Sequence, residues 1–136
     1  MRPLNSLTKR DLLAAKKFDA DEVRLYAEEH FEAERLGDAF ELFAKIKDRD
    51  GVTKIRDLAI RQGDPEVLWR IAHREPDLVS KSDWETCGKS AMHMKKHRSA
   101  LFAFQRAGNE ELVTQAEKAV NPDAAPPQPP PAPDQE

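Results

Sequence analysis

Apolar and small residues recur along this chain at the three- and four-residue spacing of amphipathic α-helices. The pattern is clearest between Trp84 and Ala107, where it predicts two helices joined by a turn near residues 95–97. Small residues on the two apolar faces would let the helix backbones approach closely, while a large aromatic side chain from each helix fills the remaining space. The positions on these faces are Trp84, Cys87, Gly88 and Ala91 in the first helix and Ala100, Phe104 and Ala107 in the second.

Helix-capping residues divide the remainder of the chain into further short helices. Asp19 with Glu22 has the spacing of a capping box, and Gly63 followed by Asp64-Pro65 ends one helix and begins the next at once. These signals predict helices over residues 8–17, 20–36, 38–47, 52–62, 65–75 and 109–120. The other caps are assigned to Thr8, Asp38, Ser82 with Glu85, and Asn109, and the other helix ends to Gly37 and Gly108.

Two segments of the chain share one spacing of apolar positions, which indicates an internal repeat. The first unit would cover residues 20–53 and the second residues 81–114. Between them, residues 52–75 form a shorter hairpin with an unusually tight turn at Gly63. The matching positions are Val23, Ala27, Ala39, Phe43 and Ile46 in the first unit and Trp84, Gly88, Ala100, Phe104 and Ala107 in the second.

The second unit resembles the tetratricopeptide repeat, a helix hairpin of 34 residues with the pattern W-x2-L-G-x2-Y followed by A-x3-F. Aligned on Trp84, the chain has the expected residue types at Gly88 and Phe104, whereas Cys87 replaces the usual Leu and Ala91 the usual Tyr. The resemblance is best over this unit, weaker over the first, and poor in the hairpin between them.

The resemblance implies an all-α fold, a short right-handed α-solenoid of three antiparallel helix hairpins plus flanking helices. This domain would occupy residues 1–120. Residues 121–136 hold seven of the ten prolines, and we expect them to form a disordered Pro-rich tail. The tail contains P-x-x-P spacings, so it is either an inert solubilising segment or a ligand for a proline-binding domain.

Composition and charge narrow the classes of function. The 136 residues carry a net charge of −3, which is not typical of a general binder of nucleic acids or anionic membranes. One cysteine allows no intramolecular disulfide, and no apolar run approaches the ~20 residues of a membrane span. Residues 1–18 have no long apolar core and no small-residue cleavage site, so we expect them not to act as a secretory signal. We therefore expect a cytoplasmic protein.

Nothing in the sequence nominates catalytic residues, a cofactor or a metal site. Gly-rich phosphate loops and nucleophile motifs are missing, so we expect no enzyme activity. Cys87, His93 and His97 are the best metal-ligand candidates, but the predicted turn separates the two histidines and Cys87 lies on a packing face. His30 and His73 lie beside apolar stripes and are interpreted as structural.

The expected function is a non-catalytic protein–protein interaction module, an adaptor or scaffold with a concave helical groove for a peptide or protein. Alternatives are a self-associating structural subunit and a nucleic-acid-binding module that uses the basic turn at 95–98. The resemblance implies that first-helix positions off the hairpin seam line the groove, and their cationic and apolar character favours an acidic and apolar peptide. These positions are Arg24, Glu28, Phe31, Arg56, Ile60, Lys89, Met92 and His93.

Overall fold

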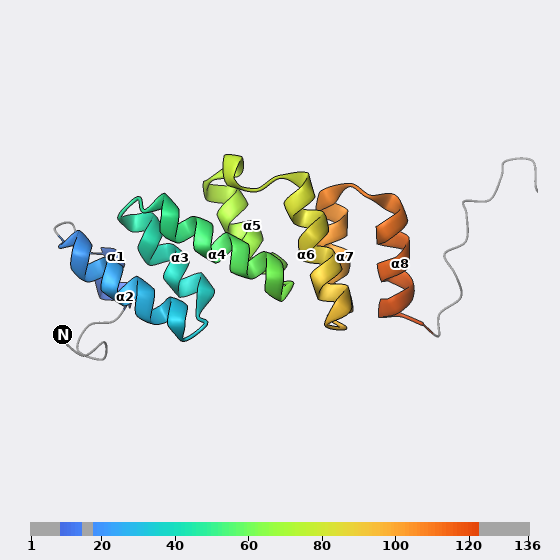
Figure 1. Ribbon diagram of the computed structural model, residues 1–136, viewed down its shortest axis with the longest axis horizontal. Coiled ribbons are helices and arrows are strands. Elements are labelled where there is room, and N and C mark those ends of the chain that lie inside the picture. Colours follow the sequence, from blue (N-terminus) through green and yellow to red (C-terminus); the bar gives the residue numbers. More distant parts are fainter. Residues whose placement is uncertain (1–8, 15–17, 123–136) are drawn as a thin grey trace, which may run out of the picture.

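The computed structural model describes residues 9–14 and 18–122, and within these ranges all regular structure is helical (Figure 1), which confirms the all-α prediction. The Thr8 cap and residues 123–136 of the Pro-rich tail lie outside the described residues. The helices are α1 (Lys9–Ala14), α2 (Ala20–Glu32), α3 (Leu36–Lys45), α4 (Arg49–Gln62), α5 (Pro65–Arg74), α6 (Lys81–His93), α7 (His97–Ala107) and α8 (Glu110–Val120), with a short 3-10 helix at Pro76–Leu78.

Two of the predicted turns have the expected geometry. Gly63 adopts the left-handed conformation at φ 63°, and Asp64 then caps α5 by accepting a hydrogen bond from the Val67 N–H at 3.3 Å. Gly108 is left-handed at φ 74°, and the Asn109 side chain caps α8. At these turns glycine adopts a positive φ at little steric cost, and the next residue supplies a side-chain cap.

The predicted end of the second helix is wrong. The prediction was residues 20–36 with Gly37 as terminator, but α2 ends four residues earlier. Glu34 takes the left-handed conformation at φ 59°, and the Arg35 N–H donates to the His30 carbonyl at 2.8 Å to close the turn. Because this turn is completed by backbone hydrogen bonds, it needs no glycine.

The predicted starts of the next two helices are also corrected. Asp38 does not cap α3, which already begins at Leu36; its carboxylate instead accepts a hydrogen bond from Lys9 Nζ of α1 at 2.7 Å. The fourth helix was predicted from residue 52, but α4 begins three residues earlier. Its cap is Asp48, whose carboxylate accepts from the Gly51 N–H at 3.0 Å.

The capping box of α6 lies two residues before its predicted place. Ser80 Oγ accepts a hydrogen bond from the Asp83 N–H at 3.1 Å, and the Asp83 carboxylate accepts from the Ser80 N–H at 2.9 Å. Ser82 and Glu85, the predicted pair, are both inside the helix. Because both serines have an acidic residue three positions later, local spacing does not distinguish them.

The internal repeat extends over three helices rather than two. Helices α2, α3 and α4 begin at residues 20, 36 and 49, and α6, α7 and α8 begin at 81, 97 and 110, so each start recurs 61 residues later. The turns repeat as well, and α5 with the 3-10 helix separates the two units. The equivalent pairs are Glu34 with Lys95 and Lys47 with Gly108 at left-handed turn positions, and Asp48 with Asn109 at N-caps.

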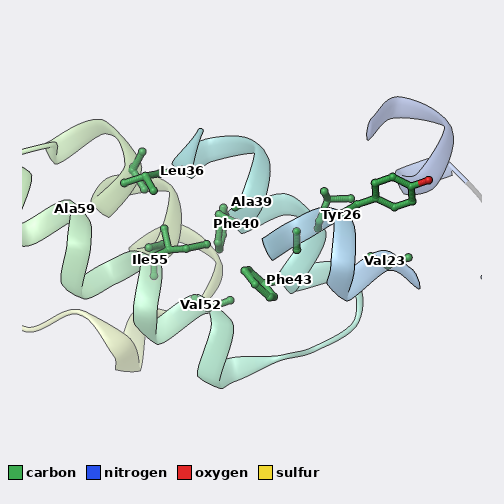
Figure 2. Close-up of a cluster of buried hydrophobic side chains, with 13 residues drawn as sticks. Val23, Tyr26, Leu36, Ala39, Phe40, Phe43, Val52, Ile55 and Ala59 are labelled. Carbon is green, nitrogen blue, oxygen red and sulfur yellow. The ribbon is translucent and has the colours of Figure 1, made fainter. Parts of the chain in front are cut away.

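The helices form an elongated row from α1 and α2 at one end to α8 at the other (Figure 1). From α2 to α8 each helix packs against the next, while α1 packs against α3. In addition α3 contacts α5, α5 contacts α7, and α4 contacts α6. In the first buried cluster, Phe40 and Phe43 of α3 lie beside Val52 and Ile55 of α4 (Figure 2). Two smaller clusters continue the core through α6, α7 and α8.

Burial at the repeat positions follows the predicted pattern, with one difference in pairing. Eight of the ten matched positions are buried, and Ile46 and Ala107 are half-buried. Trp84 belongs to the cluster of α4 and α6, where its ring is 6.2 Å from Phe102, whereas Phe104 packs in the cluster shared with α8. The two aromatic residues therefore fill neighbouring parts of the core rather than one shared space.

Candidate protein-binding site

An open cavity of about 580 Å³ lies between α5 and α7, and we call it the α5–α7 groove. These two helices contact each other directly. One wall is formed by the N-cap and the first two turns of α5. The other wall is formed by one face of α7, where the lining residues recur at four-residue spacing. The lining residues are Asp64, Pro65, Glu66 and Trp69 on one side and Arg98, Ser99, Phe102 and Arg106 on the other.

Two aromatic rings give the groove an apolar character. Trp69 is 40% exposed, and its ring stacks on His73 with centroids 4.8 Å apart. Phe102 is half-buried and lies against Trp84 of the core. The outer ring is thus held in place by a stacking partner and the inner ring by the core, so both are ordered before a ligand arrives, which lowers the entropic cost of binding.

Two arginines and two acidic residues line the groove. The Arg106 guanidinium lies 4.8 Å from the centroid of the Phe102 ring, and Arg98 lines the cavity at its other end. The two acidic residues of the rim have partners: Asp64 caps α5, and Glu66 lies 3.6 Å from Arg70. The groove therefore offers two cations beside exposed aromatic surface.

Local sequence explains why Trp69 faces outward. The buried face of α5 includes Val67, Leu68 and Ile71. Trp69 follows Leu68 in the sequence, but its side chain is on the opposite side of the helix. A tryptophan outside the apolar stripe of its own helix is the signal by which the sequence itself indicates this site. Its companion Phe102 could be recognised only from the packing of α5 against α7.

A second, shallower hollow adjoins the groove at the basic turn. It measures about 340 Å³ and shares Arg98 and Ser99 with the α5–α7 groove. One of its cations is already engaged, since Lys96 Nζ donates to the Gln62 carbonyl at 2.9 Å. Val120, at the end of α8, also lines the hollow. The remaining lining residues are Lys95 and His97.

The sequence-predicted site residues of the first unit have mainly internal contacts. Arg24 Nε donates to Asp48 at 3.0 Å, so it joins α2 to the cap of α4. Phe31 packs on the first cluster, and Lys54 Nζ lies 5.1 Å from the centroid of its ring. Glu28 is exposed. Of these three side chains, two therefore connect neighbouring helices.

The predicted residues of the middle hairpin support the fold. Arg56 donates to the Leu78 carbonyl at 2.9 Å and pairs with Asp57, so it holds the 3-10 helix against α4. Ile60 is only 9% exposed and belongs to the second cluster, together with Trp84. Ile60 therefore contributes to the core rather than to an open surface.

The predicted residues of the last unit are the most accessible. Lys89 is exposed and lies 3.3 Å from Glu85 one turn earlier, and His93 is exposed at the end of α6. Met92 is half-buried against the third cluster. None of the eight predicted residues lines the α5–α7 groove.

The metal-ligand candidates are separated in the structure. Cys87 is fully buried against the Ala59 carbonyl, and burial raises the pKa of its thiol to about 12, with Asp64 adding to the rise. His97 begins α7, beyond the turn that follows His93. In the part of the chain that the structure describes, no three His, Cys, Asp or Glu side chains form a group that could hold a metal ion.

No family model, curated protein or solved structure matches this chain. Across residues 9–14 and 18–122, no helix combines the length and the apolar composition needed to cross a bilayer. The physical properties of the surface are therefore the basis for assigning a function.

Proposed function

We propose that this protein is a non-catalytic interaction module, an adaptor or scaffold that binds a segment of another protein in the α5–α7 groove. One observation carries the proposal: exposed Trp69 and half-buried Phe102 line an open cavity together with Arg98 and Arg106. Residues that dominate protein–protein binding energies are enriched in tryptophan and arginine, and they act where a pocket removes them from water.

The expected ligand follows from the lining. Covering the Trp69 ring would remove apolar surface from water at ~25 cal/mol per Å², and two guanidinium groups can each donate several hydrogen bonds to carboxylates or carbonyls. A segment with apolar and acidic residues fits this surface. The resemblance pointed to the first helices of the hairpins, whereas the groove lies between two second helices.

The architecture that we propose for this function is a short right-handed α-solenoid of three tetratricopeptide-like hairpins with α1 and α8 at its ends. The contacts of α3 with α5, α5 with α7 and α4 with α6 support it, because stacked hairpins bring equivalent helices together. The free thiol of Cys87 fits the cytoplasmic location that we propose.

Affinity capture with paired variants tests the function. The intact chain would be used as bait in a lysate of its source, alongside Trp69→Ala and Arg98→Glu. The matched controls are Leu25→Ala, which removes another exposed apolar side chain, and Arg61→Glu, which makes the same charge change on α4. Circular dichroism verifies that all four variants are folded.

We expect the two groove variants to lose a partner that the two controls retain. With that partner purified, each groove variant should bind at least tenfold more weakly, which is ~1.4 kcal/mol. A partner retained equally by all variants would place the site elsewhere, and a Lys89→Glu, His93→Glu double variant would then test the first-helix surface. Strongly salt-dependent retention of RNA or DNA, or a mass that rises with concentration, would instead favour one of the two alternatives.

A further inference from the structure

We propose that the α5–α7 groove is occupied by the chain's own Pro-rich segment, residues 123–136, which competes with the external partner. This docking rests on the proposed function of the groove and specifies how that function is regulated. Three observations support it: the position where the described chain ends, the length of the segment, and the match between its chemistry and that of the lining.

The described chain ends beside the groove. Val120, at the end of α8, lines the hollow that shares Arg98 and Ser99 with the groove. Because Val120 and the first residues of α7 line the same hollow, the last turn of α8 lies at the start of α7, beside Arg98. Residues after Pro122 therefore start next to the Arg98 end of the binding surface, with only a few residues needed to enter it.

The segment is long enough to follow the whole groove. From Ser99 to Arg106, α7 rises about 10 Å at ~1.5 Å per residue. The 14 residues from 123 to 136 would span about 43 Å as a polyproline II helix at ~3.1 Å per residue. The prolines of residues 126–133 would extend further than the rings of Trp69 and Phe102, so only some of them would contact these rings in any one docked position.

The chemistry of the segment complements that of the groove. Proline-rich segments dock on exposed aromatic rings, because their pyrrolidine faces are apolar and the polyproline conformation has little entropy to lose. The indole N–H of Trp69 is a donor for the proline carbonyls, which are strong acceptors. Asp123, Asp134 and Glu136 are the charged residues of the segment, and all are acidic. The groove holds Arg98 and Arg106 for them, whereas its own carboxylates have other partners: Asp64 caps α5 and Glu66 lies beside Arg70.

Tethering gives the segment an advantage over an external ligand. A segment that starts next to its site has an effective concentration of about 1 mM. Even weak docking, with a dissociation constant of about 100 μM, would therefore occupy the groove in most molecules. An external partner would then bind about tenfold more weakly than it binds an open groove. The Pro-rich segment would act as a built-in competitor.

Paramagnetic relaxation measures this docking in the full chain. Gln135→Cys would carry a nitroxide label, while Cys87, fully buried, stays unlabelled; mass spectrometry verifies one label per chain. We expect strong broadening of the Trp69 indole and of the Phe102 and Arg106 amides, but not of the amides in α2. A full-length variant with the six prolines at 126, 127, 129, 130, 131 and 133 replaced by Ser should lose most of the broadening.

Two results would overturn the proposal. Broadening confined to residues around Pro122 would show that the segment does not enter the groove. Broadening that appears only between a labelled chain and a separate ¹⁵N-enriched chain, and that fades on dilution, would show that the occupant is the segment of a second copy.

The outcome is separable from that of the proposed function. A Trp69-dependent partner that binds the full chain and the proline-to-serine variant equally would keep the function and remove the competitor. Groove broadening together with a roughly tenfold gain in partner affinity for the proline-to-serine variant would support both.

Discussion

The ring of Phe104 in α7 lies against the backbone of Gly88 in α6, so closely that a Cβ atom at position 88 would overlap the ring. Phe43 of α3 makes the equivalent contact with Gly51 of α4. The two units thus use the same pair of residue types, but the glycine belongs to different helices. In both places the absence of a side chain allows an aromatic ring to approach a helix backbone.

This contact predicts an inverted effect for a glycine-to-alanine change. In an ordinary helix interior, alanine stabilises by ~0.5–1 kcal/mol. Gly88→Ala should instead destabilise by ~1–2 kcal/mol, because the overlap with Phe104 costs more than the gain in helix propensity. Urea unfolding measures the difference.

Gly37→Ala is the matched control. Its Cβ would meet only the flexible end of Arg70, with Nη1 2.8 Å away, so no loss is expected. Phe104→Ala should cost ~3–5 kcal/mol and should largely remove the effect of Gly88→Ala. A Gly88→Ala protein at least as stable as the original would contradict the packing.

The burial of His30 predicts a dependence of stability on pH. Burial lowers the pKa of its imidazole; nearby Asp38 opposes the shift, and Arg35 and Lys9 add to it. Its Nδ1 is buried without a hydrogen-bond partner among the described residues. The pKa of His30 in the folded state therefore lies below the value of about 6.5 in the unfolded state. The contribution of neutral His30 to the free energy of unfolding is complete above a pH of about 6.5, and it is lost as the pH falls through the folded-state pKa.

The measurement is the free energy of unfolding between pH 7.5 and 5.5. His30→Gln should flatten the decline that the original protein shows on acidification. His93→Gln removes a histidine from an exposed position and is the matched control. Equal slopes for all three proteins would mean that His30 does not titrate differently on folding.

The buried thiol of Cys87 predicts resistance to alkylation. With the pKa raised to about 12 and no exposed surface, the reactive thiolate forms only when α4 and α6 separate. At pH 8 the folded chain should react at least about a hundredfold more slowly than the urea-unfolded chain. A Ser82→Cys, Cys87→Ala chain provides an accessible thiol as the control, and a fast reaction of Cys87 in the native protein would contradict its burial.

The capping box of α6 predicts different effects for two nearby serines. Ser80→Ala removes the acceptor for the Asp83 N–H and should cost ~1 kcal/mol. Ser82→Ala, two residues further on, should change stability by less than ~0.5 kcal/mol because Ser82 is exposed inside the helix. Thermal melts of the two variants decide between the observed box and the one predicted from the sequence.

Sequence spacing alone was sufficient for features that depend on neighbours a few residues apart. The apolar faces of the helices, the turn at Gly63 and the Asn109 cap are examples, because periodicity, a positive φ and an N-cap all arise within one or two turns. The same locality explains the misplaced boundaries. Glu34 and Lys47 take positive φ values that sequence reasoning assigns to glycine, because backbone hydrogen bonds from the completed turns hold them there.

The candidate site depended on contacts between distant parts of the chain. Trp69 and Phe102 are 33 positions apart, and they share a groove only because α5 packs beside α7. Ile60 is buried for the same reason, since α6 covers the face of α4 on which it lies. The sequence determined which residues are apolar and where helices form, whereas tertiary packing decided which apolar residues are covered and which remain available to a ligand.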